Sequence, residues 1–243
     1  MTLMTKKVAL VVGGASGIGL ATVNRLAAEG ATVYFTGRNA ETVTAATREA
    51  GQGVQGLVAD AGVPEQIDQV IAQVLQAQGR IDALVLNAGI SEFAPLETTS
   101  SDHFDRHFAI NVRSAVLALQ STSVGMARGA SVVVVGSIAG HAGVANFGTY
   151  AATKAALRSY VRSWTAELAP RGIRINMVSP GPTDTAMFAS VPDEARAAVV
   201  STIPLGRMAQ PSEIAASIVF LLSEQASFIA GAEMCVDGGA RQI

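Results

Sequence analysis

A glycine-rich turn between a short apolar strand and an amphipathic helix restricts the fold of this chain more than any other feature. The apolar run Val8–Val12 leads into Gly13-x-x-x-Gly17-x-Gly19, and apolar residues then recur at helical spacing over Ile18–Glu29. Glycines in this context permit a tight turn and let a backbone approach a pyrophosphate. The helix N-terminus adds free N–H groups and a partial positive charge. The pattern therefore predicts a dinucleotide-binding strand–turn–helix unit.

Strands and helices continue to alternate along the whole chain. Further strands are predicted at Thr32–Thr36, Gly53–Ala59, Ile81–Leu86, Ser131–Val135, Ile173–Val178 and Ala232–Val236. Helices are predicted over 40–50, 64–78, 101–126, 147–168, 193–200 and 213–222. No repeat or linker divides the chain, so we expect one domain over residues 1–243. Its predicted fold is α/β: a Rossmann-type, doubly wound, seven-stranded parallel sheet with helices on both faces.

Composition excludes several classes of partner. The chain has 243 residues, a formal net charge of −2, and no basic run longer than Lys6-Lys7, which argues against binding to nucleic acid or an anionic membrane. The lone Cys235 rules out an intrachain disulfide and a cysteine zinc site. The apolar runs Val8–Val12 and Ile214–Leu222 are too short for a secretion signal or a membrane span. We therefore expect a soluble, cytoplasmic protein.

Tyr150 and Lys154 are four residues apart in a predicted helix, so they lie one turn from each other on the same face. An ammonium group held there favours the phenolate and should lower the tyrosine pKa from its reference of about 10. Tyr150 would then serve as a proton donor and acceptor near neutral pH.

The end of the second predicted strand bears on the choice of cofactor. It reads Thr36-Gly37-Arg38-Asn39, with Arg38 where NAD-dependent enzymes usually carry an acid. Arg38 is either an ordinary solvated loop residue or the partner of a 2′-phosphate, which a guanidinium binds bidentately. The second interpretation predicts NADP(H). Asp60, after the third strand, is placed to meet the adenine edge.

Together these motifs resemble the short-chain dehydrogenase/reductase family, and the likeness covers essentially the entire chain. The family's glycine pattern is kept, with Val12 in place of its threonine, and its Asn-Asn-Ala-Gly motif appears as Leu86-Asn87-Ala88-Gly89. The family's catalytic serine, thirteen residues before the tyrosine, matches Ser137, and its catalytic asparagine matches Asn111. Its Pro-Gly motif and following threonine match Pro180-Gly181 and Thr185.

The resemblance implies reversible reduction of a carbonyl by hydride transfer from NADP(H). Tyr150 would exchange a proton with the substrate oxygen, Ser137 would orient that oxygen, and Lys154 would hold the ribose of the nicotinamide half. Asn111 would hold a water that links Lys154 to solvent. The expected cofactor-binding residues are Gly13, Ser16, Gly17, Ile18, Gly19, Arg38, Asp60, Ala61, Asn87, Ala88, Gly89, Tyr150, Lys154, Pro180, Gly181, Thr183 and Thr185.

The substrate pocket is expected to be mostly apolar and to suit medium or bulky hydrophobic carbonyls. Its predicted lining is Ala139, His141, Phe147, Met187 and Phe188. Two other functions stay open: a 3-oxoacyl-thioester reductase, for which Arg113, Arg158 and Arg162 offer a basic rim, and a catalytically inactive dinucleotide sensor. His103 and His107 lack a third ligand in the sequence, so we expect a polar helix face and no metal site.

Two further expectations concern motion and assembly. The segment from about 185 to 204 interrupts the strand–helix alternation beyond the sixth strand, so it is predicted to be a mobile lid over the substrate. The predicted helices over 101–126 and 147–168 carry more apolar and small residues than one buried face needs. A two-fold partner would bury the excess, and the resembled family usually pairs through these helices and the final strand. We therefore expect a homotetramer.

Overall fold

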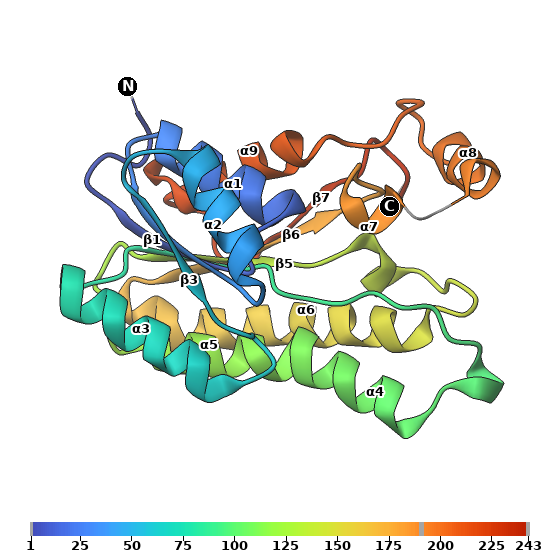
Figure 1. Cartoon of the computed structure of the whole chain (residues 1–243), viewed down its shortest axis with the longest axis horizontal. Helices are drawn as coiled ribbons and strands as arrows, with labels where there is room; N and C mark the ends of the chain where they lie inside the picture. Colours follow the sequence, from blue (N-terminus) through green and yellow to red (C-terminus); the bar gives the residue numbers. More distant parts are fainter. Residues whose placement is uncertain (1, 190–191, 242–243) are drawn as a thin grey trace.

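A single parallel sheet runs through the computed structural model of the chain, which describes residues 2–189 and 192–241 (Figure 1). Its order is β3-β2-β1-β4-β5-β6-β7, so consecutive strands add outward in both directions from β1 and β4. The strands are β1 Val8–Val12, β2 Thr32–Gly37, β3 Val54–Val58, β4 Ala83–Leu86, β5 Ser131–Val135, β6 Arg174–Pro180 and β7 Glu233–Val236. The predicted doubly wound, seven-stranded parallel fold is confirmed.

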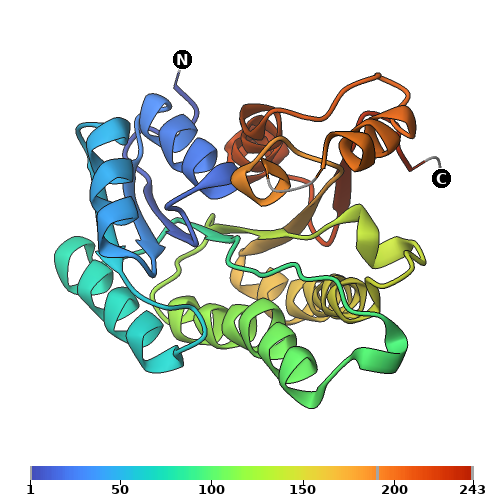
Figure 2. The ribbon, with the colours of Figure 1, turned by 45° about the vertical axis from the view of Figure 1, so that its right-hand side comes forward.

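Two helical layers cover the sheet, one on each face (Figure 1, Figure 2). The helices are α1 Gly17–Ala28, α2 Ala40–Ala50, α3 Pro64–Gln78, α4 Ser101–Phe108, α5 Ser114–Ser123, α6 Gly148–Leu168, α7 Ala186–Ala189, α8 Asp193–Ser201 and α9 Pro211–Leu222. Helices α3, α5 and α6 pack over one apolar core, and α1, α2 and α9 over the other. Strands β1, β4 and β5 are buried along their whole length, which explains their nearly continuous apolar sequence.

Most predicted element boundaries agree with the structure to within two residues, and the largest difference lies in the long helix expected over 101–126. A π-helical segment, Ala109–Arg113, separates α4 from α5, and α5 ends at Ser123. Hydrophobic spacing carries no signal for an i→i+5 turn, which occurs mostly as a single turn at functional sites. Helix α7 was also not expected.

Some of the apolar residues for which we expect a partner subunit, in the helices predicted over 101–126 and 147–168, are buried within the chain itself. Ala115, Ala118 and Leu119 of α5, and Trp164 of α6, belong to the core beneath the sheet. Tyr160, by contrast, remains 38% exposed and stacks on Trp164. The four core residues of α5 and α6 therefore offer no free apolar surface to a partner subunit. The homotetramer stays a prediction.

Among the residues that the structure describes, no helix is both long and apolar enough to cross a membrane. The expected cytoplasmic location stays a prediction.

A substitution at Gly19 tests the close packing of α1 against the glycine turn that precedes it. A Cβ atom there would lie 2.0 Å from the carbonyl oxygen of Gly13 and 2.7 Å from Nδ2 of Asn87. We expect Gly19→Ala to lower the free energy of unfolding by about 1–3 kcal/mol, the usual effect of overpacking, and to weaken dinucleotide binding. Urea unfolding and calorimetry measure both effects. Gly143→Ala is the control, because a Cβ at Gly143 meets nothing within 4 Å; equal behaviour of the two variants would contradict the prediction.

Candidate active site

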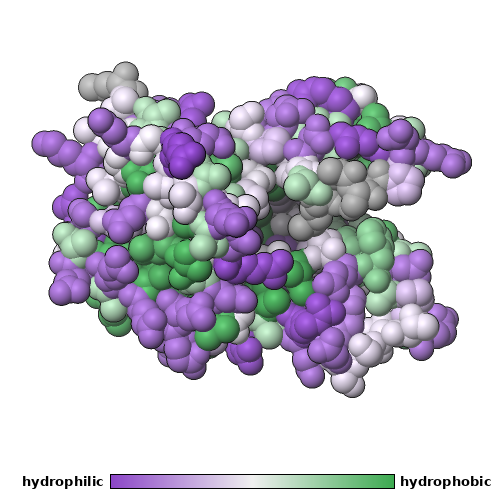
Figure 3. All heavy atoms as spheres, in the orientation of Figure 1, coloured by the Kyte–Doolittle hydropathy of each residue, from purple (hydrophilic) through white to green (hydrophobic). Residues whose placement is uncertain are grey.

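A cleft of about 560 Å³ follows the carboxyl ends of strands β1 to β6. Open α/β sheets bind their ligands at this edge. The surface is hollowed between the two helical layers, on the side where α7 and α8 lie (Figure 3). The predicted site residues that line the cleft are Gly13, Ser16, Gly17, Ile18, Arg38, Asp60, Ala61, Asn87, Ala88, Gly89, Ser137, Ala139, Phe147, Tyr150, Lys154, Pro180, Gly181, Thr183, Thr185 and Phe188. Gly19, Asn111 and His141 do not line it, and the side chain of Met187 lies outside what the structure describes.

Hydrogen bonds from neighbouring strands hold the glycine turn in place. The N–H of Gly13 donates to Oγ1 of Thr36 at 3.0 Å, and Nδ2 of Asn87 donates to the Gly13 carbonyl at 2.7 Å. The backbone of Val12 accepts from the N–H of Ala88 at 2.9 Å. Thr36 is not among the predicted site residues, and its only sequence signal is a hydroxyl at the end of an apolar strand. The Thr36 hydroxyl accepts a hydrogen bond from the turn, whereas the apolar side chain of Val12 has no acceptor to offer.

The N-terminus of α1 leaves polar groups free toward the cleft. Ser16 is the N-cap residue, yet its side chain makes no capping hydrogen bond. Gly17 has a φ of 53°, and a Cβ there would lie 3.3 Å from Cγ2 of Thr185. Thr185 therefore stands directly over the helix terminus. The first N–H groups of a helix have no partner within it, so this corner is suited to an anion such as a pyrophosphate.

Arg38 lies beside this corner at the end of β2. It is exposed, and within the described part of the chain it makes no ion pair or side-chain hydrogen bond. Its neighbour Asn39 is occupied, because its Oδ1 caps α2 by accepting from the N–H of Thr42 at 2.9 Å. Asp60, just after the neighbouring strand β3, also lines the cleft, and its Oδ1 accepts from the N–H of Gly62 at 2.8 Å.

Ser137, Tyr150 and Lys154 meet where β5 ends against α6. The Ser137 hydroxyl lies near enough to the Tyr150 phenol to act on its pKa. Oγ of Ser137 also accepts from the N–H of Ala139 at 3.1 Å. The ammonium of Lys154 donates to the carbonyl of Val135 at 2.9 Å and lies 5.6 Å from the centre of the Tyr150 ring. The structure thus brings together the three residues that the sequence places in two distant motifs.

The expected lowering of the tyrosine pKa is wrong in this structure. Burial raises the pKa of the Tyr150 phenol, because a phenolate there would lose its solvation, and the nearby Ser137 hydroxyl offsets only part of this rise. Burial also lowers the pKa of Lys154 to about 8. The phenol therefore keeps its proton at neutral pH, which is the form that a proton donor needs.

Asn111 lies behind the cleft, on the π-helical segment. Its Oδ1 accepts from the N–H of Ile90 at 2.8 Å, and its Nδ2 donates to the Ile90 carbonyl at 2.9 Å and to Oγ1 of Thr153 at 3.0 Å. A Cβ at Gly89 would lie 3.3 Å from Oδ1 of Asn111 and 3.7 Å from Nζ of Lys154. Asn111 and Lys154 therefore border the same small space.

The predicted substrate residues separate into two groups. Ala139, Phe147 and Phe188 line the cleft, and Phe147 packs against both Tyr150 and Phe93, with ring centres 4.5 Å and 4.6 Å apart. The expectation for His141 is wrong, because His141 is absent from the lining of the cleft and its ring is hydrogen-bonded to the carboxylate of Glu233. A buried histidine beside a carboxylate favours that partner over an apolar pocket.

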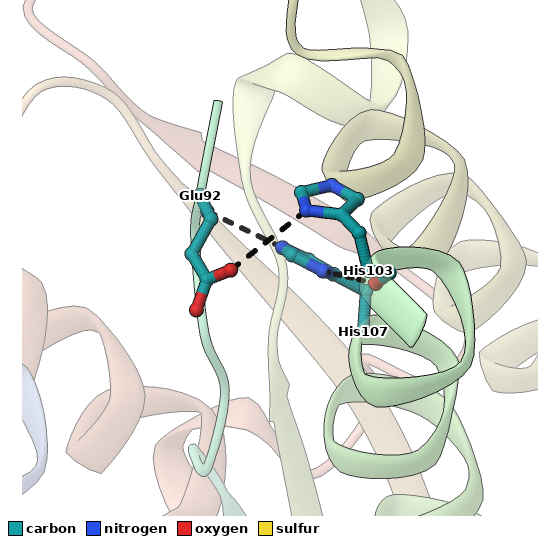
Figure 4. Close-up of side chains that lie close together, drawn as sticks. All are labelled: Glu92, His103 and His107. Atoms are coloured by element: carbon teal, nitrogen blue, oxygen red, sulfur yellow. Dashed lines mark hydrogen bonds and ion pairs between the residues drawn. The ribbon is translucent and has the colours of Figure 1, made fainter. Parts of the chain in front are cut away.

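The other two histidines are buried, so the expected polar helix face is also wrong. Glu92 comes close to His103 and His107 in the fold and is the third potential ligand that the sequence does not reveal (Figure 4). Both nitrogens of His107 are already engaged: Nδ1 with the His103 carbonyl at 2.7 Å, and Nε2 with the N–H of Glu92 at 3.2 Å. The Glu92 carboxylate accepts hydrogen bonds from Nη1 and Nη2 of Arg106, each at 3.0 Å. The contacts of Glu92 with His107 and Arg106 therefore hold the loop after β4 against α4.

A doubly wound sheet that carries a serine, a tyrosine and a lysine beside a glycine turn defines a class of dinucleotide-dependent oxidoreductases. Comparison with known proteins narrows this class. A family model described as enoyl-(acyl carrier protein) reductase matches residues 13–241. The chain belongs to the short-chain dehydrogenase/reductase family.

Three relatives illustrate the range of that family. A cyclopentanol dehydrogenase from Comamonas sp. is 39% identical over 96% of each chain. A 3-oxoacyl-(acyl-carrier-protein) reductase from Thermotoga maritima is 38% identical over 96% of this chain and 97% of its own. The crystal structure of a short-chain dehydrogenase from Burkholderia cenocepacia in complex with NADP superimposes with a TM-score of 0.92 at 32% identity, over 98% of this chain and 99% of its own.

The buried ammonium of Lys154 predicts an unusual dependence of stability on pH. Its pKa in the folded protein, about 8, lies below the value of 10.5 for the free side chain, so the unfolded chain holds more protons between these values. The free energy of unfolding should therefore rise with pH in this window. At pH 7, Lys154→Met should be more stable than the unmodified protein by about 1–3 kcal/mol, since removing the buried charge outweighs losing one hydrogen bond.

Urea unfolding from pH 7 to 10.5 measures this difference, which should shrink as pH rises above 8. Lys7→Met, which removes a partly exposed ammonium paired with Glu224, is the control and should show no such trend. A stability difference for Lys154→Met that stays constant over this range would contradict the prediction.

Proposed function

We propose that the protein is an NADPH-dependent oxidoreductase that reversibly reduces a ketone or aldehyde to an alcohol. The observation that carries this proposal is the convergence of Ser137, Tyr150 and Lys154 on the cleft that also holds the glycine turn. A proton donor and a dinucleotide-binding corner then share one space, which is what hydride transfer to a carbonyl requires.

The residues of the chain account for the proton and the orientation of the substrate. Tyr150, whose phenol is protonated at neutral pH, gives its proton to the carbonyl oxygen, and Ser137 donates a hydrogen bond that orients and polarises the same oxygen. Lys154 binds the ribose hydroxyls of the nicotinamide half. Asn111 holds a water that carries protons between Lys154 and solvent. NADPH, when bound, supplies the hydride.

The free groups around the glycine turn fit NADPH. The uncapped side chain of Ser16 and the first N–H groups of α1 suit the pyrophosphate. Arg38 has no ionic partner in the described part of the chain, and it suits the 2′-phosphate. The related Burkholderia enzyme, whose structure contains NADP, supports the same choice.

The lining of the cleft favours an uncharged, apolar substrate. Its basic residues are Arg38 and Lys154, and both belong to the dinucleotide half, while Phe147 and Phe188 offer apolar surface near Tyr150. The cyclopentanol dehydrogenase relative is consistent with a small cyclic ketone or alcohol.

The alternative, a 3-oxoacyl-thioester reductase, is supported by the relative from Thermotoga maritima. The basic rim that it needs is weaker in the structure than in the sequence. Arg158 is paired with Glu233 at 2.8 Å, and Arg113, Arg158 and Arg162 are absent from the lining of the cleft. A dinucleotide sensor without catalytic activity is disfavoured, because it would not need Ser137, Tyr150 and Lys154 held together in the cleft.

Two proposals concern the whole molecule. The segment from about 185 to 204, of which residues 190 and 191 lie outside the described part of the chain, acts as a lid over the substrate. This proposal is supported by Thr185 and Phe188, which line the cleft from α7 and the residue before it. The protein assembles as a homotetramer in which exposed Tyr160 of α6 and the outermost strand β7 meet partner copies.

Tyr150→Phe tests the proposed proton donor. The ring and its packing against Phe147 remain, so NADPH affinity should change less than twofold, while turnover should fall by about a hundred- to ten-thousandfold, the usual contribution of a positioned general acid. Oxidation of NADPH with a panel of cyclic, aromatic and thioester ketones measures turnover. Tyr160→Phe, on the exposed side of the same helix, is the control. Near-normal turnover by Tyr150→Phe would remove Tyr150 from the mechanism.

Arg38→Asp tests the choice of cofactor. Losing a charge-assisted hydrogen bond worth about 1.5–3 kcal/mol should raise the Kd for NADPH by about ten- to a hundredfold and leave NADH binding the same or tighter. Calorimetric titration with both dinucleotides measures the change, with Arg48→Asp on the exposed face of α2 as control. Tighter binding of NADH than NADPH by the unmodified protein would overturn the assignment.

A further inference from the structure

Glu233, at the start of β7, receives polar side chains from three other segments of the chain. Its carboxylate accepts a hydrogen bond from Oγ of Ser179 at 2.7 Å and another from the ring of His141, and it pairs with Nε of Arg158 at 2.8 Å. The Glu233 side chain is only 15% exposed and that of His141 only 9%. Breaking such a buried network leaves unpaired polar groups and is therefore costly.

Each of the three partners lies next to a proposed catalytic element. His141 ends the 3₁₀ turn Ile138–His141, which begins directly after Ser137. Arg158 lies one turn beyond Lys154 on α6. Ser179 is buried near the end of β6 and lies against Gly136, where a Cβ would come within 2.5 Å of its Oγ. Glu233 thus joins the segments that position the serine and the lysine, although it does not line the cleft itself.

The turn Ile138–His141 packs closely on α6, and the link to Glu233 adds a polar contact to it. Its backbone hydrogen bonds are internal: Gly140 donates to the Ser137 carbonyl at 3.0 Å, and Ala139 donates to Oγ of Ser137 at 3.1 Å. Within residues 2–189 and 192–241, the bond between His141 and Glu233 is the turn's only hydrogen bond to another element. The orientation of the Ser137 hydroxyl is therefore coupled, through the turn, to a residue almost a hundred positions later.

We propose that Glu233 is a positioning residue for the reaction. Through His141 it holds the turn so that the Ser137 hydroxyl faces Tyr150, while Arg158 and Ser179 hold the carboxylate itself. This inference rests on the proposed function, because it assigns Glu233 a role in orienting the substrate oxygen through Ser137.

Glu233→Gln tests the inference, since it keeps the size of the side chain and removes its charge. We expect kcat for ketone reduction to fall about ten- to a hundredfold, with KM and the Kd for NADPH changed less than twofold. Glu224→Gln, which alters an exposed glutamate that is paired with Lys7 and takes no part in the network, is the control and should leave kcat unchanged. A normal kcat for folded Glu233→Gln would overturn the inference.

A double-mutant cycle separates positioning from a general structural effect. In a Ser137→Ala background, Glu233→Gln should lower the remaining kcat by less than twofold, because the hydroxyl that it positions is gone. An equal loss in both backgrounds would show that Glu233 does not act through Ser137. His141→Gln breaks the same link from the other side and leaves the Glu233–Arg158 pair intact, so it should reproduce the loss even if Glu233→Gln does not fold.

Amide hydrogen exchange distinguishes failure of this inference from failure of the proposed function. The amide protons of Ala139 and Gly140 both bond to Ser137, so they should exchange at least tenfold faster in Glu233→Gln and unchanged in Glu224→Gln. Unchanged exchange in Glu233→Gln would overturn the inference whatever the activity. Faster exchange in a protein that reduces no carbonyl would overturn the proposed function and retain the coupling between Glu233 and the turn.

Discussion

The buried ammonium of Lys154 is the group on which the arrangement of the site depends. It donates to the carbonyl of Val135 at the end of β5, so it joins α6 to the edge of the sheet at the point where the cleft opens. That contact places Tyr150, one turn earlier on the same helix, beside Ser137. The position of the proposed proton donor, Tyr150, relative to the glycine turn therefore follows from how α6 packs against β5.

The same burial determines the chemistry of these groups. Removing water from the phenol and the ammonium raises the pKa of Tyr150 and lowers that of Lys154, so both neutral forms are favoured. The Tyr150 phenol therefore keeps its proton at neutral pH, as the proposed proton donor must. The site also accepts a cost in stability, because the charged lysine is held where water cannot solvate it.

Long-range polar contacts hold the loops around this centre. Hydrogen bonds of His107 hold the loop after β4 against α4. The hydrogen bond and the ion pair of Glu233 connect the turn after β5 and α6 to β7. Neither contact belongs to the two apolar cores that cover the sheet. Both contacts lie at loops that border the cleft, where backbone groups have no regular partners.

The order of strands and helices, the glycine turn and the pairing of Tyr150 with Lys154 could be predicted from the sequence, because they depend on spacing within one element or between adjacent ones. Four other features follow from tertiary contacts: the bond of His141 to Glu233, the burial of His103 and His107, the π turn at Asn111 and the raised pKa of Tyr150. Each of these features depends on which distant residues surround a group and on how much water they exclude. The spacing of residues along the chain does not reveal either of these two factors.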